Sequence, residues 1–203
     1  MAIIDVAKCD NKGLILVLCG PSGVGKTSIK ISLLSQNKDF ELVPSVTTRP
    51  KTKGDDATGI KEYHHITEAE YGQLYEHGML ISKKVEQFGF HYGIIISEIT
   101  CALDGGCNVL LETTLWGIEQ LKRYFNNIVS VFVSPPSIEE LERRLRKRSR
   151  EDEGDIVLRL GLAKQVLAGF RKDMVDYHLI NKDLQMSIDF VNRIIVQKNF
   201  GCR

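Results

Sequence analysis

Residues 20–27, Gly-Pro-Ser-Gly-Val-Gly-Lys-Thr, place three glycines, a lysine and a hydroxyl at the spacing of a phosphate-binding loop. Glycines let the backbone curl so that successive N–H groups point at phosphate oxygens. Lys26 is expected to reach the β- and γ-phosphates, and the Thr27 hydroxyl to ligate Mg²⁺. An apolar run precedes the loop and a helix-forming stretch follows, as such loops require. The sequence therefore predicts a nucleoside triphosphate site formed by Gly20, Ser22, Gly23, Val24, Gly25, Lys26, Thr27 and Ser28.

A second group of anion-binding side chains lies in residues 45–54, Ser-Val-Thr-Thr-Arg-Pro-Lys-Thr-Lys-Gly. Hydroxyls and a guanidinium this close together can bind phosphate through short hydrogen bonds and a bidentate arginine contact. Taken alone, the segment is more typical of a β-edge and a turn. Tyr63 and Tyr92 follow, however, and add two phenolic donors. Together these residues predict a second phosphate site.

A basic helix at 139–147 and the charged loop after it form a third group. Helical spacing puts Arg144 and Arg148 on one face, and Arg159 comes from the next helix. These three arginines could close over a triphosphate and stabilise charge on the transferring phosphoryl group. The acidic residues around them cancel most of the positive field, which disfavours a nucleic-acid interface.

Composition limits the other classes of protein. The chain has 203 residues, a net charge of +1 and 43% hydrophobic residues, which suits one α/β domain with an insertion. Five widely spaced cysteines without a C-x-x-C pair favour reduced thiols in the cytoplasm. No apolar stretch approaches the ~20 residues that cross a bilayer, so no membrane partner is expected. We expect a monomer or a homodimer.

Alternating apolar runs and helical stretches predict a parallel sheet flanked by helices. The expected strands are 14–19, 107–111, 128–133 and 178–180, and the expected helices are 25–36, 115–125, 137–148, 155–176 and 183–197. Residues 42–100 do not follow this alternation of strands and helices. They predict short strands near 42–47, 62–66 and 79–92 and one helix near 67–77. This block is interpreted as an inserted lobe within a core of residues 1–41 and 101–203, and the charged loop 148–155 as a mobile lid.

The ordered set of motifs resembles the guanylate kinase family over nearly the whole chain. The motifs are Gly20–Thr27, Ser45–Pro50, Tyr63, Gly89-x-x-Tyr92-Gly93, Trp116-Gly117, Val133–Ser137, Leu141–Arg148, Ile156–Leu160, and Asp176-Tyr177 leading to Asn181–Asp183. The resemblance implies a P-loop core, a monophosphate-binding lobe and a small lid. It also implies transfer of the γ-phosphate of ATP to GMP with Mg²⁺ bound.

By the same resemblance, Ser45, Arg49, Tyr63 and Tyr92 would hold the acceptor phosphate. Lys26, Arg144, Arg148 and Arg159 would act in transfer, and Asn181 would lie near the adenine or ribose of ATP. Lys83, Glu112 and Thr114 occupy the positions from which family members read the base.

The departures from the family pattern fall in that base-reading group. Lys83 stands where a glutamate is usual, Ile94 replaces a hydroxyl residue, and Trp116 replaces a glutamine. A carboxylate accepts from the N1–H and the 2-amino group of guanine, whereas lysine can only donate. Three alternatives follow: a rebuilt guanine site, in which Glu86 could substitute; another nucleotide or a sugar phosphate as acceptor; or a binding module without catalysis. The complete phosphate loop argues against the last.

Overall fold

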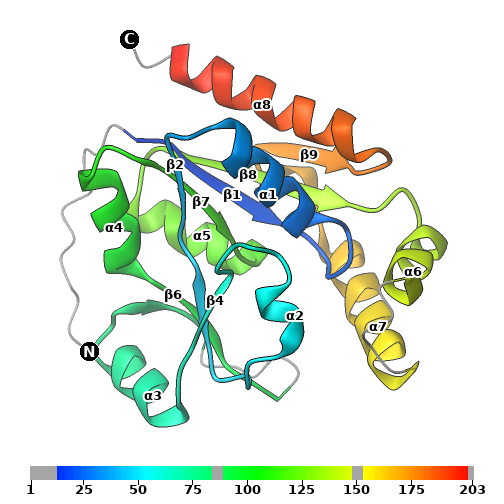
Figure 1. Ribbon diagram of the computed structural model, residues 1–203, viewed down its shortest axis with the longest axis horizontal. Coiled ribbons are helices and arrows are strands. Elements are labelled where there is room, and N and C mark those ends of the chain that lie inside the picture. Colours follow the sequence, from blue (N-terminus) through cyan, green and yellow to red (C-terminus); the bar gives the residue numbers. More distant parts are fainter. Residues whose placement is uncertain (1–12, 84–88, 148–152, 201–203) are drawn as a thin grey trace. The chain divides into compact units, whose positions relative to one another are not determined.

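The computed structural model describes residues 13–83, 89–147 and 153–200. Figure 1 shows their helices and strands. The chain divides into a first unit, residues 1–17 and 38–128, and a second unit, residues 18–37 and 129–203. Strand β1 (Ile15–Cys19) runs across the boundary, and all five of its residues are buried. An unbroken apolar strand is expected where helices cover both faces of a parallel sheet.

The first unit contains the strand order β2-β7-β1. Strands β2 (Phe40–Leu42) and β7 (Asn108–Glu112) pair in parallel, with Phe40 opposite Asn108. The Asn108 side chain accepts from the Leu14 amide at 2.7 Å and donates to Asp39 at 2.6 Å, which fixes the start of the sheet. Helices α4 (Ile96–Asp104) and α5 (Leu115–Tyr124) flank β7 in the sequence and bury apolar faces.

A second sheet of the first unit has the order β4-β3-β6-β5. Strands β3 (Ser45–Thr47) and β4 (Tyr63–His65) are parallel, and β6 (Tyr92–Ile95) and β5 (Leu80–Ile81) continue the sheet antiparallel. Val46, Tyr71 and Leu80 form the core between this sheet and helix α3 (Glu68–Glu76). The short helix α2 (Lys53–Asp56) connects β3 to β4.

The second unit contains strands β8 (Ile128–Ser134) and β9 (Tyr177–Ile180), which pair in parallel. Helices α1 (Lys26–Gln36) and α8 (Leu184–Phe200) lie side by side (Figure 1), and Asn37 of the α1 cap donates to Asn192 of α8 at 3.0 Å. Helices α6 (Ile138–Lys147) and α7 (Glu153–Gly169) follow β8, and a 3₁₀ turn, η1 (Lys172–Met174), leads into β9.

The predicted α/β class with a parallel sheet is confirmed, whereas several boundaries are wrong. The sequence predicts a helix over 155–176, but α7 ends at Gly169. The chain leaves the helix there because the Phe170 ring stacks on the Phe132 ring, with the ring centroids 3.8 Å apart. The first turn of α7 already occupies 153–155, the end of the expected lid loop, while residues 148–152 lie outside the described part. Helix α4 is missing from the predicted elements.

The predicted division into a core and an inserted lobe remains a prediction. Residues 42–100 all lie within the first unit, and the boundaries of the two units fall elsewhere. Within the residues that the structure describes, no helix is both long and apolar enough to cross a membrane.

A carboxylate directly before the edge strand β9 stabilises the second unit. Asp176 accepts from the Ser130 amide at 2.8 Å and from the Ser130 hydroxyl at 2.6 Å, and Ser130 is fully buried in β8. Ser130→Ala should lower the free energy of unfolding by about 1–2 kcal/mol, because a charged acceptor loses a buried donor. Urea denaturation checks this value. Ser35→Ala, at an exposed hydroxyl of α1, should change it by less than about 0.5 kcal/mol, and equal losses would contradict the assignment.

Candidate functional site

The loop between β1 and α1 adopts the left-handed backbone that its glycines permit. Gly20, Gly23 and Gly25 have φ angles of 138°, 86° and 103°. A Cβ atom at Gly20 would lie 2.1 Å from the Val133 carbonyl oxygen, and one at Gly25 would lie 2.5 Å from Nδ2 of Asn181. Both positions therefore need glycine for conformation and for space. The loop opens into the N-terminus of α1, where backbone N–H groups and the helix dipole favour an anion.

The side chains of this loop lie as a phosphate site requires. Lys26 is only 7% exposed, and its ammonium donates to the carbonyls of Gly20 and Pro21, both at 2.7 Å. The charge is therefore held over the loop rather than extended into solvent. Thr27 and Ser28 follow in the first turn of α1 and are half-buried. The predicted loop residues are thus brought together, and their roles in binding remain predictions.

Two predicted arginines contact the loop from other helices of the second unit. Arg144 of α6 donates to the Val24 carbonyl of the loop at 3.5 Å and to the Asn181 carbonyl at 2.9 Å. Arg159 of α7 donates to the Ser22 hydroxyl at 2.7 Å. Glu140 orients Arg144 through a hydrogen bond of 2.8 Å. Hydrogen bonds from Arg143 and Arg144 lower the pKa of Glu140 to about 2, so it stays ionised. Arg148 lies outside the described residues.

Asn181 has a structural contact that sequence reasoning did not find. Its side chain is buried and donates to the Val24 carbonyl at 2.8 Å, while Ser187 donates to its Oδ1 at 2.9 Å. The amide therefore connects the start of α8 to the top of the loop. No signal in the sequence pairs positions 24 and 181, since they are far apart in the chain. The expected contact between Asn181 and adenine or ribose stays a prediction.

Within the first unit, three of the four residues predicted to bind the acceptor phosphate lie on adjoining strands, and the fourth, Arg49, follows β3. Ser45 is opposite Tyr63 in the β3–β4 ladder, and Tyr92 is opposite Thr47 in the β3–β6 ladder. The Tyr63 and Tyr92 rings meet edge to face with centroids 6.2 Å apart. The Arg49 guanidinium lies 5.3 Å from the centroid of the Tyr63 ring. This arrangement puts two phenolic side chains and a cation together, and their role in binding a phosphate remains a prediction.

Asp55 is a partner of this cluster that the prediction omits. It accepts from both terminal nitrogens of Arg49, at 2.7 and 3.1 Å, and also receives hydrogen bonds from Thr52. Partial burial opposes ionisation of Asp55, but the bonds from Arg49 and Thr52 outweigh it and lower its pKa to about 2. The capping-box pattern from Thr52 to Asp55 was a visible sequence signal for this carboxylate.

Tyr63 is kept in its neutral form. Burial of the ring, and then the negative charge of Glu112, raise the pKa of the phenol above its ordinary value. A neutral phenol can donate to a phosphate oxygen, whereas a phenolate would repel it. Tyr63 and Asp55 also line a hollow of about 650 Å³. The other residues that line it are Lys51, Gly59, Ile60, Lys61, Glu62, His64, His65 and Ile66.

The residues predicted to read the base are described in part. Glu112 ends β7 and is half-buried. The Thr114 hydroxyl accepts from the Gly117 amide at 3.2 Å and so caps α5, which is a structural use of that side chain. The Lys83 ammonium lies 5.2 Å from the centroid of the Trp116 ring. Glu86 lies outside the described residues.

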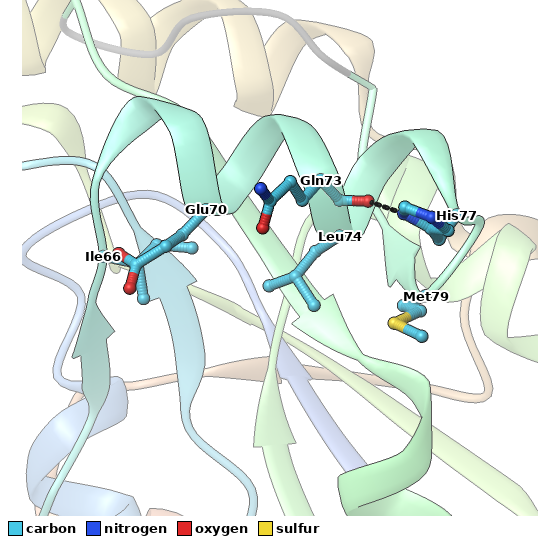
Figure 2. A pocket seen from close by; sticks show the side chains of 6 residues that line it. All are labelled: Ile66, Glu70, Gln73, Leu74, His77 and Met79. Atoms are coloured by element: carbon cyan, nitrogen blue, oxygen red, sulfur yellow. Dashed lines mark hydrogen bonds between the residues drawn. The ribbon is translucent and has the colours of Figure 1, made fainter.

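A separate hollow of about 420 Å³ lies along α3 (Figure 2). The Nδ1–H of His77 donates to the Gln73 carbonyl at 2.7 Å. Figure 2 shows this bond, with Leu74 and Met79 beside it. None of the residues predicted for a site lines this hollow, and the cluster around Arg49 and Tyr63 lies at the other one.

The glycine loop, its buried lysine and the arginines on it define an α/β kinase of the P-loop class. Residues 12–198 match the family described as guanylate kinase. The chain is 36% identical to a guanylate kinase of Wolbachia pipientis wMel over 188 residues, 91% of this chain and 90% of that one. It is 34% identical to one of Thermotoga maritima, covering 91% and 86%. The chain belongs to the guanylate kinase family.

A solved structure supports the same assignment. The crystal structure of guanylate kinase from Anaplasma phagocytophilum matches with a TM-score of 0.69 and 27% sequence identity. The match covers 92% of this chain and 86% of that one.

Gly25 should tolerate no side chain. Gly25→Ala should lower the free energy of unfolding by about 1–3 kcal/mol, because alanine is strained at this φ and its Cβ would overlap the Asn181 amide. The matched control is Gly161→Ala, in α7, where an added Cβ meets no atom within 4 Å. It should stabilise the chain by about 0.5–1 kcal/mol. Thermal or urea unfolding of both variants checks the signs, and the same sign for both would contradict the argument.

The bond between Arg49 and Asp55 should make stability depend on pH. Because the pKa of Asp55 is lowered in the fold, its contribution is complete above the ordinary carboxyl pKa of about 4 and is lost as pH falls towards about 2. Asp55→Asn should therefore cost about 1 kcal/mol or less at pH 7, since the pair keeps some exposure, and still less at pH 3. Urea titrations at both pH values measure the difference. Asp173→Asn, at an exposed pair, is the control, and a loss for Asp55→Asn that does not shrink at pH 3 would refute the argument.

Proposed function

We propose that this protein transfers the γ-phosphate of ATP to GMP, forming ADP and GDP. The observation that carries the proposal is the position of Lys26, Arg144 and Arg159 around one glycine loop. Membership of the guanylate kinase family supports the choice of reaction. ATP would bind with its phosphates against the backbone N–H groups of the loop and the helix α1 N-terminus.

The chemistry needs position and charge rather than a covalent intermediate. Lys26 would neutralise the β- and γ-phosphates, and Arg144 and Arg159 would stabilise negative charge on the transferring group. Arg159 is already hydrogen-bonded to Ser22 of the loop, and Arg144 to the carbonyl of Asn181. Little rearrangement of the two arginines is therefore needed when charge develops on the transferring group. Arg148 is proposed as a further arginine of the same group.

The acceptor phosphate would be bound in the first unit by Ser45, Arg49, Tyr63 and Tyr92. Arg49 offers a planar fork of donors, and the neutral phenol of Tyr63 offers one more. The bidentate contact with Asp55 holds the guanidinium beside the Tyr63 ring. Asp55 is therefore proposed to position Arg49 for the incoming phosphate.

Mg²⁺ would be held chiefly by the nucleotide phosphates and water, with the Thr27 hydroxyl as its ligand from the protein. Among the described residues, no group of three or more His, Cys, Asp or Glu side chains could hold a metal ion. A single hydroxyl ligand from the protein, with phosphates and water completing the set, fits Mg²⁺, which keeps several waters and binds substrate phosphates in kinases. When bound, the metal neutralises developing charge on the β- and γ-phosphates. We further propose ATP and a nucleoside monophosphate as the binding partners, and the cytoplasm as the location.

The test is ADP release by the full chain with ATP, Mg²⁺ and GMP. Lys26→Met should lower kcat at least about 100-fold with an unchanged fold, because it removes the positive charge held over the loop. Lys38→Met, at an exposed lysine, should leave the rate unchanged. Absence of GMP-dependent ADP release, or a Lys26→Met variant as active as the parent, would reject the proposal.

A further inference from the structure

Lys83 and Trp116 form a cation–aromatic pair in the first unit. The ammonium lies 5.2 Å from the ring centroid, the lysine is exposed, and the indole is half-buried. Lys83 follows strand β5 closely, and Trp116 lies in the first turn of α5, whose start is fixed by the Thr114 cap. A cation over an indole face is attracted by the ring quadrupole, so the lysine has a preferred place despite its exposure.

Hydrogen bonds connect this pair to the proposed acceptor-phosphate cluster. Ser82, the neighbour of Lys83, donates to the Tyr92 carbonyl at 2.8 Å and also bonds the Tyr71 hydroxyl. The Tyr92 ring in turn contacts Tyr63. The Lys83–Trp116 pair therefore adjoins the Tyr63–Tyr92 cluster within a single unit. An acceptor bound by its phosphate at that cluster would reach the pair if its base extends towards Ser82 and Lys83.

The two side chains select a particular base edge. A lysine ammonium can donate hydrogen bonds but cannot accept them. Guanine presents O6 and N7 as acceptors, whereas adenine presents a donor amine at position 6. The indole face provides a platform on which any base can stack, and the flexible, exposed side chain of Lys83 can move from the ring to the edge of that base. Ile94, two residues after Tyr92, is 2% exposed and its side chain offers no polar atom.

We infer that Lys83 and Trp116 bind the acceptor base, the indole by stacking and the ammonium by donating to the oxygen at position 6. The consequence is a wider substrate class: 6-oxopurine monophosphates, with hypoxanthine accepted nearly as well as guanine. A donor at position 6 does not read the 2-amino group, which is the difference between these bases. This inference rests on the proposed function, because it assumes a nucleoside monophosphate in the acceptor site.

The chain supplies its own reporter, since Trp116 is its single tryptophan. Stacking of a base on the indole should quench its fluorescence. The full chain is titrated with GMP, IMP and AMP in the absence of ATP. We expect quenching by GMP and IMP with Kd values within about tenfold of each other, and binding of AMP at least about 100-fold weaker. A site that hydrogen-bonds the 2-amino group of GMP would instead reject IMP, which lacks that group, by about 10⁴-fold or more. The ratio of the GMP and IMP affinities therefore separates a site that reads the 2-amino group from one that does not.

Substitutions at Lys83 test its role directly. Lys83→Met should weaken GMP and IMP by the same factor, because the lost donor contacts an oxygen that both bases carry. Lys83→Glu should raise the preference for GMP over IMP, because a carboxylate accepts from the 2-amino group that only guanine has. Lys122→Met, at an exposed lysine on the same helix as Trp116, is the control and should change neither affinity.

The outcomes separate this inference from the proposed function. Quenching by GMP and IMP without any ADP release would support the base assignment and reject the phosphotransfer. Phosphorylation of GMP with no change in Trp116 fluorescence would overturn the inference, as would a wild-type preference for GMP over IMP above about 1,000-fold. If Lys83→Glu does not fold, the wild-type ratio and Lys83→Met decide the question: unequal losses for the two nucleotides would also overturn it.

Discussion

The conformation of the glycine loop is the constraint that organises the second unit. Three of its glycines have positive φ angles, a conformation that an isolated loop would not keep. Asn181 holds the loop by donating to the Val24 carbonyl, and the Arg144 guanidinium donates to the backbone of Asn181. Because each of these groups is also fixed by its own helix or cap, the loop takes its shape from several elements together rather than from its glycines alone.

The electrostatics of the second unit follow from the same arrangement. Glu140, Arg144, Asn181 and the loop form a chain of hydrogen bonds in which the arginine is paired with a carboxylate. Placing several cations close together would otherwise be unfavourable, because like charges repel. The partial burial of Arg144 strengthens these interactions relative to those of a fully exposed arginine, because solvent screens them less.

Local sequence patterns predicted much of the fold and of the site. Contacts between residues that lie far apart in the chain could not be predicted in this way. The phosphate loop and the Arg49, Tyr63 and Tyr92 group are readable because residue type and spacing carry their chemistry. Helix α4 also had a readable signal, with Ile96, Ile99 and Ala102 at helical spacing, but it lies where the sequence favoured an inserted lobe of short strands. The Asn181–Val24 bond had none, and the end of α7 depends on a ring stack between Phe170 and Phe132 that no local pattern reports.

The position of the residues that hold the loop bears on how the protein folds. The loop is translated early, at residues 20–27, but the groups that fix it come from residues 144, 159 and 181. Contacts of such high sequence separation form late, after much of the chain has been ordered. A chain emerging from the ribosome would therefore hold its phosphate loop in a defined shape only after Asn181 and the first turn of α8 have been made. Nucleotide binding would thus stabilise the finished fold and leave partly synthesised chains unprotected.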